Sequence, residues 1–115
     1  MRWFEQVKYE HGSPAYQGDE IKKCFGDEDN GLLFQIINHD ERKWAYYNDT
    51  VYYNMFIRAA FSEKSKIAPL GKTMKEVDPD TKEFIFELTV APGATEMFLE
   101  GEPKGMKIQY NAHPK

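Results

Sequence analysis

Residues 51–61 constrain the fold of this chain more than any other part of its sequence. Every second residue is apolar, so one face of an extended chain would carry Val51, Tyr53, Met55, Ile57, Ala59 and Phe61. A β-strand points successive side chains to opposite faces of its sheet, whereas a helix repeats every 3.6 residues. The period of two predicts a half-buried strand. Residues 84–90 show the same alternation, and we expect Phe86 and Trp44 to lie in the core.

Three consecutive strands are expected in the first half of the chain. Residues 32–37 are apolar on both faces except at Gln35, which is typical of a strand covered on both sides. A polar stretch of hairpin length separates them from residues 43–47, and residues 48–50 separate that strand from the long one. We therefore expect these three strands to form a meander.

A second hairpin is expected around residues 78–82, which place Pro and Asp where tight turns favour them. This turn would join residues 75–77 to residues 84–90. Between the meander and this hairpin, residues 62–67 can form one turn of helix before Pro69 and Gly71 end it. No longer helix is expected anywhere in the chain.

A third hairpin is expected at residues 101–105, where two glycines permit positive φ and a proline fixes its own. It would join residues 97–99 to residues 106–110. Many short strands separated by turn signals predict an all-β fold, an antiparallel β-sandwich of about 7–8 strands. We expect residues 1–115 to form a single domain, with residues 1–11 as an extended lead-in.

Charge and composition exclude several classes of function. The formal charge is −4, and no Lys/Arg cluster is interrupted by aromatic residues, so nucleic acid is not an expected partner. No apolar run approaches the roughly 18 residues that span a bilayer. The start, Met1-Arg2-Trp3, has neither a signal-peptide layout nor a Gly at position 2 for myristate. With Cys24 as the single cysteine, we expect a cytoplasmic protein.

Cys24 is the one candidate nucleophile, and His11, His39 or His113 would have to serve as its base. Cys24 precedes Phe25 in an expected strand and lacks the context of a nucleophile elbow, so a half-buried structural role is favoured. The histidines are not spaced as zinc ligands. We therefore predict no catalytic residue, no metal and no cofactor.

Two polar segments have alternative interpretations. Residues 27–31 offer oxygen ligands, but the Gly comes too early for an EF-hand loop, so an acidic turn is favoured over a calcium site. Residues 48–50, Asn-Asp-Thr, match the glycosylation sequon. Without a secretory signal, a turn held by Asx hydrogen bonds is the better interpretation.

Aromatic residues gather around the expected central hairpin: Trp44, Tyr46, Tyr47, Tyr52, Tyr53 and Phe56. If the core takes one face of the long strand, alternation turns Tyr52 and Phe56 outward, and the hairpin partner brings Tyr47 beside them. We predict that Tyr47, Tyr52 and Phe56 form a binding surface. The alternative is that another segment, such as Trp3-Phe4, covers these rings.

Several segments resemble the accessory domain of kinetoplastid calpain-related proteins. The resemblance is carried by residues 30–38, 43–50, 65–71, 90–98 and 101–105, and it extends from about Gly12 to the end. Its most specific part is the run Trp-Ala-x-Tyr-Asn-Asp-Thr at residues 44–50, in which Tyr46 stands where Phe is more usual.

This resemblance implies a non-catalytic β-sandwich linked to the membrane-associated cytoskeleton and the flagellum. The domain is separate from the papain-type protease core, whose Cys-Trp pair has no counterpart in Lys23-Cys24-Phe25. Some small members carry an acylated N-terminal Gly-Cys, from which this sequence departs. The expected function is a protein-interaction or scaffolding module with a cytoskeletal protein partner. The alternative is a lipid or fatty-acyl binding domain that uses the aromatic surface.

Overall fold

The computed structural model describes residues 9–25 and 32–115, and these ranges contain nine β-strands and no helix. The strands are β1 (Glu20–Lys23), β2 (Leu33–Asn38), β3 (Lys43–Asn48), β4 (Tyr53–Phe61), β5 (Lys66–Pro69), β6 (Met74–Val77), β7 (Phe84–Val90), β8 (Thr95–Glu102) and β9 (Lys107–Pro114). All pairs are antiparallel. The all-β sandwich is confirmed, with more strands than the seven or eight expected.

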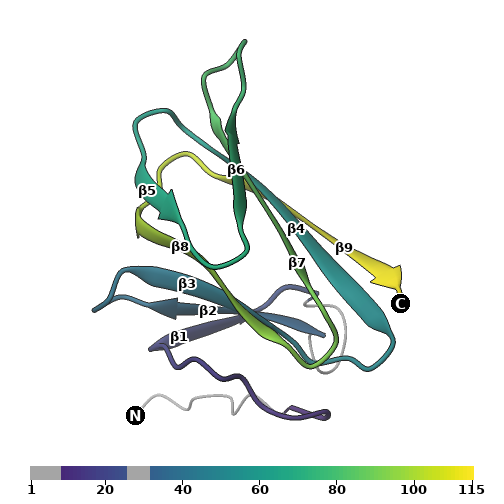
Figure 1. Ribbon diagram of the computed structural model, residues 1–115. Coiled ribbons are helices and arrows are strands. Elements are labelled where there is room, and N and C mark those ends of the chain that lie inside the picture. Colours follow the sequence, from purple (N-terminus) through teal and green to yellow (C-terminus); the bar gives the residue numbers. More distant parts are fainter. Residues whose placement is uncertain (1–8, 26–31) are drawn as a thin grey trace.

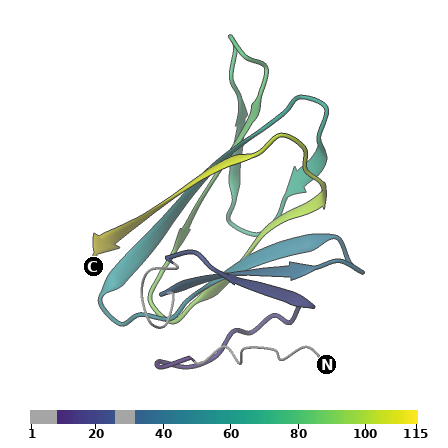
Figure 2. The same cartoon turned by 180° about the vertical axis from the view of Figure 1, so that it is seen from behind.

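The strands form two layers (Figure 1). The first sheet has the order β1-β2-β3-β8-β5, and the second has the order β6-β7-β4-β9. Viewed from behind, the same layers are seen with β9 along the outside of the second sheet (Figure 2). Because each sheet contains strands from both halves of the chain, most pairings join residues far apart in sequence.

The expected meander is only half correct. β2 and β3 do pair, with Phe34 opposite Tyr47, but β4 enters the other sheet and lies between β7 and β9. The crossing follows from the pattern of β4, whose buried face carries Met55 and Ile57. That face is buried most completely when it packs across the sandwich on the inner face of the first sheet.

The segment between β3 and β4 is a buried polar turn, as the Asx interpretation predicted. Asn48 is fully buried, and its side-chain oxygen accepts hydrogen bonds from the Thr50 N–H at 3.1 Å and the Thr50 hydroxyl at 2.7 Å. Its amide donates to the carbonyls of Tyr53 (2.7 Å) and Val90 (2.9 Å). The turn therefore ties the start of β4 to the end of β7.

The hairpin at residues 78–82 is confirmed, and it joins β6 to β7. The Asp78 carboxylate accepts hydrogen bonds from the N–H groups of Asp80 at 2.8 Å and Thr81 at 3.1 Å. The helical turn expected at residues 62–67 is wrong. A turn closed by the Ser65 N–H and the Ser62 carbonyl, 2.9 Å apart, leads instead into β5.

The hairpin expected at residues 101–105 is also wrong, because β8 and β9 belong to different sheets. The segment carries the chain across the sandwich, and the Ser65 hydroxyl holds it by accepting a hydrogen bond from the Lys104 N–H at 2.7 Å. Gly101 has a φ of 113°, and a Cβ there would lie 2.0 Å from the Lys66 carbonyl oxygen. The glycine is thus required by close packing against β5 and not by a hairpin.

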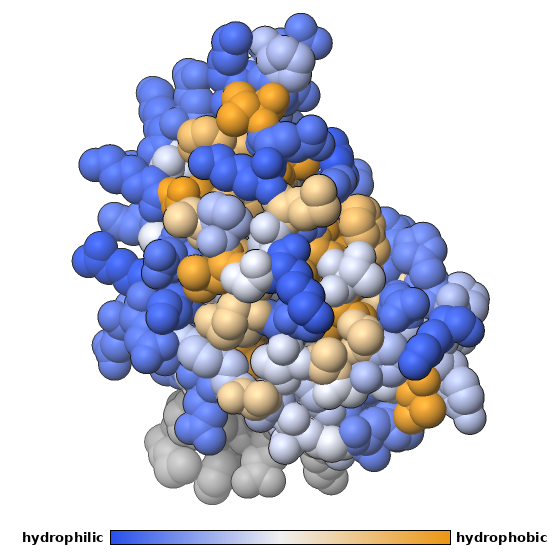
Figure 3. Space-filling view, viewed as in Figure 1, coloured by the Kyte–Doolittle hydropathy of each residue, from blue (hydrophilic) through white to orange (hydrophobic). Residues whose placement is uncertain are grey.

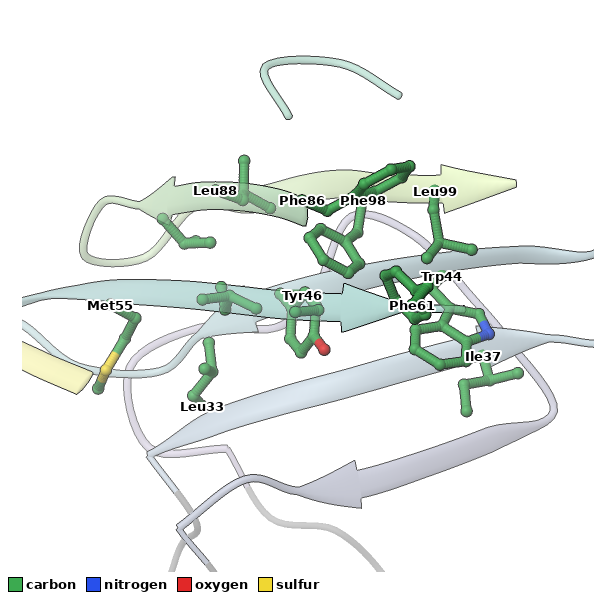
Figure 4. Close-up of a cluster of buried hydrophobic side chains, with 13 residues drawn as sticks. Leu33, Ile37, Trp44, Tyr46, Met55, Phe61, Phe86, Leu88, Phe98 and Leu99 are labelled. Carbon is green, nitrogen blue, oxygen red and sulfur yellow. The ribbon is translucent and has the colours of Figure 1, made fainter. Parts of the chain in front are cut away.

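The core lies between the two sheets (Figure 4). Its buried members are Leu33, Ile37, Trp44, Tyr46, Met55, Ile57, Ala59, Phe61, Phe86, Leu88, Val90, Phe98 and Leu99. The predicted burial of Trp44 and Phe86 is confirmed. The buried Tyr46 hydroxyl is satisfied, because it accepts a hydrogen bond from the Gln35 amide at 3.0 Å and lies 3.2 Å from the Tyr110 hydroxyl.

We predict that stability falls as the pH rises above about 10, the pKa of a tyrosine in an unfolded chain. Burial raises the pKa of Tyr46 and of Tyr47, so both keep their protons when folded and lose them when unfolded. This contribution is complete below the unfolded pKa and is lost above it. Thermal unfolding across this range tests the prediction, and tyrosinate absorbance that saturates while the fold persists would contradict it.

Candidate functional site

Tyr47 does not belong to an exposed surface, which corrects the sequence prediction. The expected alternation is right, since Tyr47 points away from the core that Tyr46 enters. However, Tyr47 is fully buried in a second cluster on the outer face of the first sheet, against which Tyr9 and Tyr16 pack. The Tyr9 ring meets the Tyr47 ring edge-on at 5.4 Å. Another segment thus covers this ring, while Trp3 and Phe4 lie outside the described residues.

A buried carboxylate anchors this covering segment. Asp49 accepts hydrogen bonds from the N–H groups of Glu10 at 2.7 Å and His11 at 2.9 Å, and from the Tyr47 hydroxyl at 2.8 Å. Three donors compensate for the loss of water around a carboxylate that is fully buried. Asp49 therefore has a structural role in fixing the lead-in to the first sheet.

Phe56 lies on β4 in the second sheet and Tyr52 just precedes that strand, whereas Tyr47 lies on β3 in the first sheet. Tyr52 is 75% exposed, and its neighbours Val51 and Tyr53 are 48% and 41% exposed. Phe56 is half-buried on the outer face of the second sheet, with its ring 6.5 Å from the His113 ring. Two of the three predicted binding residues, Tyr52 and Phe56, thus remain at a surface.

A shallow hollow lies beside Phe56. Its volume is about 220 Å³, and its lining residues are Phe56, Lys72, Met74, Glu87, Leu88 and Thr89. The register explains how they meet, because Phe56 is opposite Thr89 on β7, and Glu87 is opposite Met74 on β6. Met74 is 70% exposed, so the hollow has an apolar wall that solvent reaches. Sequence reasoning did not find Met74 because only the pairing of β6 with β7 brings it near Phe56.

Charged groups border this hollow. The Lys72 ammonium lies 3.4 Å from a carboxylate oxygen of Glu96, and Arg58 forms an ion pair with Glu87 on the outer face of the second sheet. Figure 3 shows apolar residues along the middle of one side of the molecule, interrupted by polar ones and bordered by hydrophilic side chains. An apolar wall with a cation at its border suits an amphiphile better than a fully polar ligand.

Cys24 is half-buried, as expected, and it follows the end of β1. Burial raises its pKa to about 12, and the Tyr110 hydroxyl is the side chain that hydrogen-bonds it. The candidate bases lie elsewhere: His39 contacts Asp19 at 2.7 Å, and His113 packs on Phe56. The thiol is therefore held in its protonated, unreactive form near neutral pH.

The described residues contain neither a metal-binding cluster nor a membrane-spanning helix. Within residues 9–25 and 32–115, His, Cys, Asp and Glu side chains form no group of three that can hold a metal ion. The expected acidic turn at residues 27–31, with its calcium alternative, lies outside the described part of the chain. In that part, no helix is long and apolar enough to cross a membrane.

Comparison with known proteins found one matching family model and two similar solved structures. A family model described as a domain of unknown function, DUF1935, matches residues 9–115. The NMR structure of SMP-1, a small myristoylated protein from Leishmania major, is similar with a TM-score of 0.91 and 42% identity, over 96% of this chain and 82% of that chain. A Leishmania major hypothetical protein is similar with a TM-score of 0.84 and 28% identity, over 94% and 93%. A search of curated proteins found no significant match.

Proposed function

The chain belongs to the DUF1935 family, and from that premise we propose that it is a non-catalytic module that binds a fatty-acyl chain or lipid in the hollow beside Phe56. The observation that carries the proposal is that the Phe56 ring and the exposed Met74 side chain line the same hollow of about 220 Å³. Transfer of such apolar surface from water to contact with an acyl chain is favourable.

The border of the hollow supports an amphiphile with an anionic head group. The Lys72 side chain is 77% exposed, and its partner Glu96 is 18% exposed, so the ammonium can turn from Glu96 towards a ligand in solvent. A carboxylate or phosphate would then form a charge-assisted hydrogen bond with Lys72. Arg58 and Glu87 neutralise each other on the same face and contribute no net charge.

The relatives and the exposed turn favour lipid. SMP-1 is described as a myristoylated protein, which carries an acyl chain. In the present chain, Val51 and Tyr52 are exposed apolar residues directly before β4, the strand that carries Phe56. Tyrosine suits this position because its ring contacts apolar groups while its hydroxyl stays in water.

The scaffolding role expected from the sequence stays a prediction. A module of a calpain-like protein held at the cytoskeleton or flagellum by a protein partner would co-sediment with detergent-extracted cytoskeletons. Neither Leishmania structure is described as a calpain or a cytoskeletal protein. The expected cytoplasmic location and the single-domain organisation also stay predictions.

Titration with dodecanoate below its micelle concentration tests the lipid proposal. We expect saturable shifts of the backbone amide signals of Phe56, Met74 and Thr89 in NMR spectra. Phe56→Ser is expected to weaken binding about tenfold or more, because losing the apolar contact of one large side chain costs about 1.5–3 kcal/mol. Equal affinity of Phe56→Ser and the wild type would refute the site.

Two controls separate apolar from charge effects. Met106→Ser removes an apolar side chain that is 49% exposed in the loop before β9, and it is expected to leave dodecanoate binding unchanged. Lys72→Ala is expected to weaken dodecanoate binding but not dodecyltrimethylammonium binding, since only the first has an anionic head group. Equal loss for both amphiphiles would assign Lys72 a purely structural role.

A further inference from the structure

The edges of the two sheets differ in length. Among the described strands, β1, β5, β6 and β9 lie at edges. β1, β5 and β6 have four residues each, whereas β9 has eight. β5 and β9 both end in a proline, Pro69 and Pro114, so it is their length that distinguishes these edges. Proteins commonly shorten edge strands or place proline in them, because an open row of N–H and C=O groups pairs with other chains. β9 is thus a long edge of the kind that is usually avoided.

One hydrogen bond fixes which backbone groups of β9 face outward. The Lys115 N–H donates to the Tyr52 carbonyl at 2.7 Å, and these residues are directly opposite because Pro114 pairs with Tyr53. Hydrogen-bonded and non-hydrogen-bonded pairs alternate along an antiparallel ladder. The backbone groups that face β4 are then those of Lys107, Gln109, Asn111 and His113. Those that face away belong to Ile108, Tyr110, Ala112 and Pro114, and Pro114 has no N–H.

These outward groups have no strand partner in the part of the chain that the structure describes. Figures 1 and 2 agree that β9 runs along the outside of its sheet, with β4 on one side. The register with β4 continues from Lys107 to Pro114 without a bulge. The edge therefore offers three N–H donors, from Ile108, Tyr110 and Ala112, and four carbonyl acceptors, the fourth from Pro114, in regular β geometry.

The charge around β9 indicates what can pair with it. Residues 103–115 contain Lys104, Lys107 and Lys115 and no Asp or Glu, although the whole chain has a formal charge of −4. Pairing with β9 of a second copy would bring two cationic strands together, which is unfavourable. An acidic strand would be attracted instead.

The two faces of β9 set the pattern of that strand. Ile108 and Tyr110 point towards the core side, where the Phe25 ring lies 6.3 Å from the Tyr110 ring. Lys107 and Gln109 point to the outer face and are exposed. A strand paired with β9 would place every second side chain over each face. Apolar residues suit the first face and acidic residues suit the second.

We propose that β9 binds an extended segment of a partner protein by β-strand addition, and that this segment alternates apolar and acidic residues. The backbone groups of Ile108, Tyr110 and Ala112 supply the hydrogen bonds, and Lys107 with its neighbouring lysines selects for acidic side chains. No β9 residue lines the hollow beside Phe56, although the Phe56 ring packs on His113. The two proposals use different groups, so either one can fail without the other.

Titration with a short capped peptide that alternates valine and glutamate tests the proposal. We expect amide hydrogens of Ile108, Tyr110 and Ala112 to become protected from exchange. Ala112→Pro removes an outward N–H that β4 does not use, so the fold should persist while affinity falls about tenfold, equivalent to about 1.4 kcal/mol. Asn111→Ala, which changes only a side chain, is expected to leave the affinity unchanged.

Charge provides a second test that does not depend on proline. Lys107→Glu is expected to weaken binding of the valine–glutamate peptide and to strengthen binding of a valine–lysine peptide. Equal affinity of both peptides for the wild type would refute the acidic partner. Peptide-induced protection at β6 in place of β9, or sedimentation as a dimer through β9, would overturn the proposal.

Discussion

Phe86→Ala is expected to lower the free energy of unfolding by about 3–5 kcal/mol, measured by urea denaturation followed through tryptophan fluorescence. Phe86 is fully buried, and its ring meets the Phe61 ring edge-on at 5.4 Å and the Phe98 ring at 5.9 Å. Truncation removes the transferred apolar surface and leaves a cavity between rings from both sheets. The neighbouring strands are held in register by the ladders of β7 and cannot collapse into it.

Phe86→Leu and Met106→Ala are the matched controls. Leucine retains most of the volume, so the loss should be well below that of alanine. Met106 is an exposed apolar residue, and its truncation should change the free energy of unfolding by less than about 0.5 kcal/mol. A loss below about 1 kcal/mol for Phe86→Ala would mean that residue 86 does not face the core.

Local pattern predicted strands but not the sheet to which each belongs. The period of two in residues 51–61 identified β4 and its buried face, since Met55 and Phe61 are fully buried. A face pattern is equally satisfied by a meander and by a strand on the opposite layer, because both bury the same side chains. The choice depends on contacts such as that between the Asn48 amide and the Val90 carbonyl, which are 42 residues apart.

Residues 101–105 do not form the predicted hairpin, for a related reason. The glycines and the proline in this segment are compatible with a hairpin turn and equally compatible with a crossing between the two sheets. Gly101 is needed because the Lys66 backbone approaches it closely, and nothing in residues 101–105 alone signals that approach. By contrast, the turn at residues 78–82 is closed by its own Asp78 side chain, so its sequence was sufficient.

The binding surface could be predicted only in part, because alternation gives the direction of a side chain but not whether a distant segment covers it. Alternation correctly turned Tyr47 away from the inner core, but its exposure depends on whether another segment covers it. The cover is fixed by the Asp49 carboxylate, which binds N–H groups of Glu10 and His11 nearly forty residues earlier. Tyr52 stayed exposed because it precedes β4 and has no such neighbour in the described residues.

Asn48→Ala is the second substitution with a large expected effect, a loss of about 3 kcal/mol in the free energy of unfolding. The buried side chain makes four hydrogen bonds, two as donor and two as acceptor. Alanine leaves the Val90 carbonyl and the Thr50 N–H without their Asn48 partner, and each unsatisfied buried group costs about 1–3 kcal/mol. The Thr50 hydroxyl and the Tyr53 carbonyl keep their mutual hydrogen bond at 3.2 Å. Relaxation of the structure around the turn offsets part of the summed cost of the unsatisfied groups.

A series of substitutions separates the contribution of the whole Asn48 hydrogen-bond network from that of its individual hydrogen bonds. Thr50→Val removes the hydroxyl's hydrogen bonds to the Asn48 side chain and to the Tyr53 carbonyl and should cost about 1 kcal/mol. Asn111→Ala, on exposed β9, should cost less than about 0.5 kcal/mol. Asn48→Asp keeps the acceptors, loses both donors and buries a charge, so it should be at least as harmful as alanine. The Asn48 amide holds the Tyr53 carbonyl at the start of β4. The alanine variant should therefore reduce hydrogen-exchange protection there before it does so along β7. Uniform loss of protection along both strands would show that Asn48 stabilises the whole sandwich and does not specifically fix the crossing between its sheets.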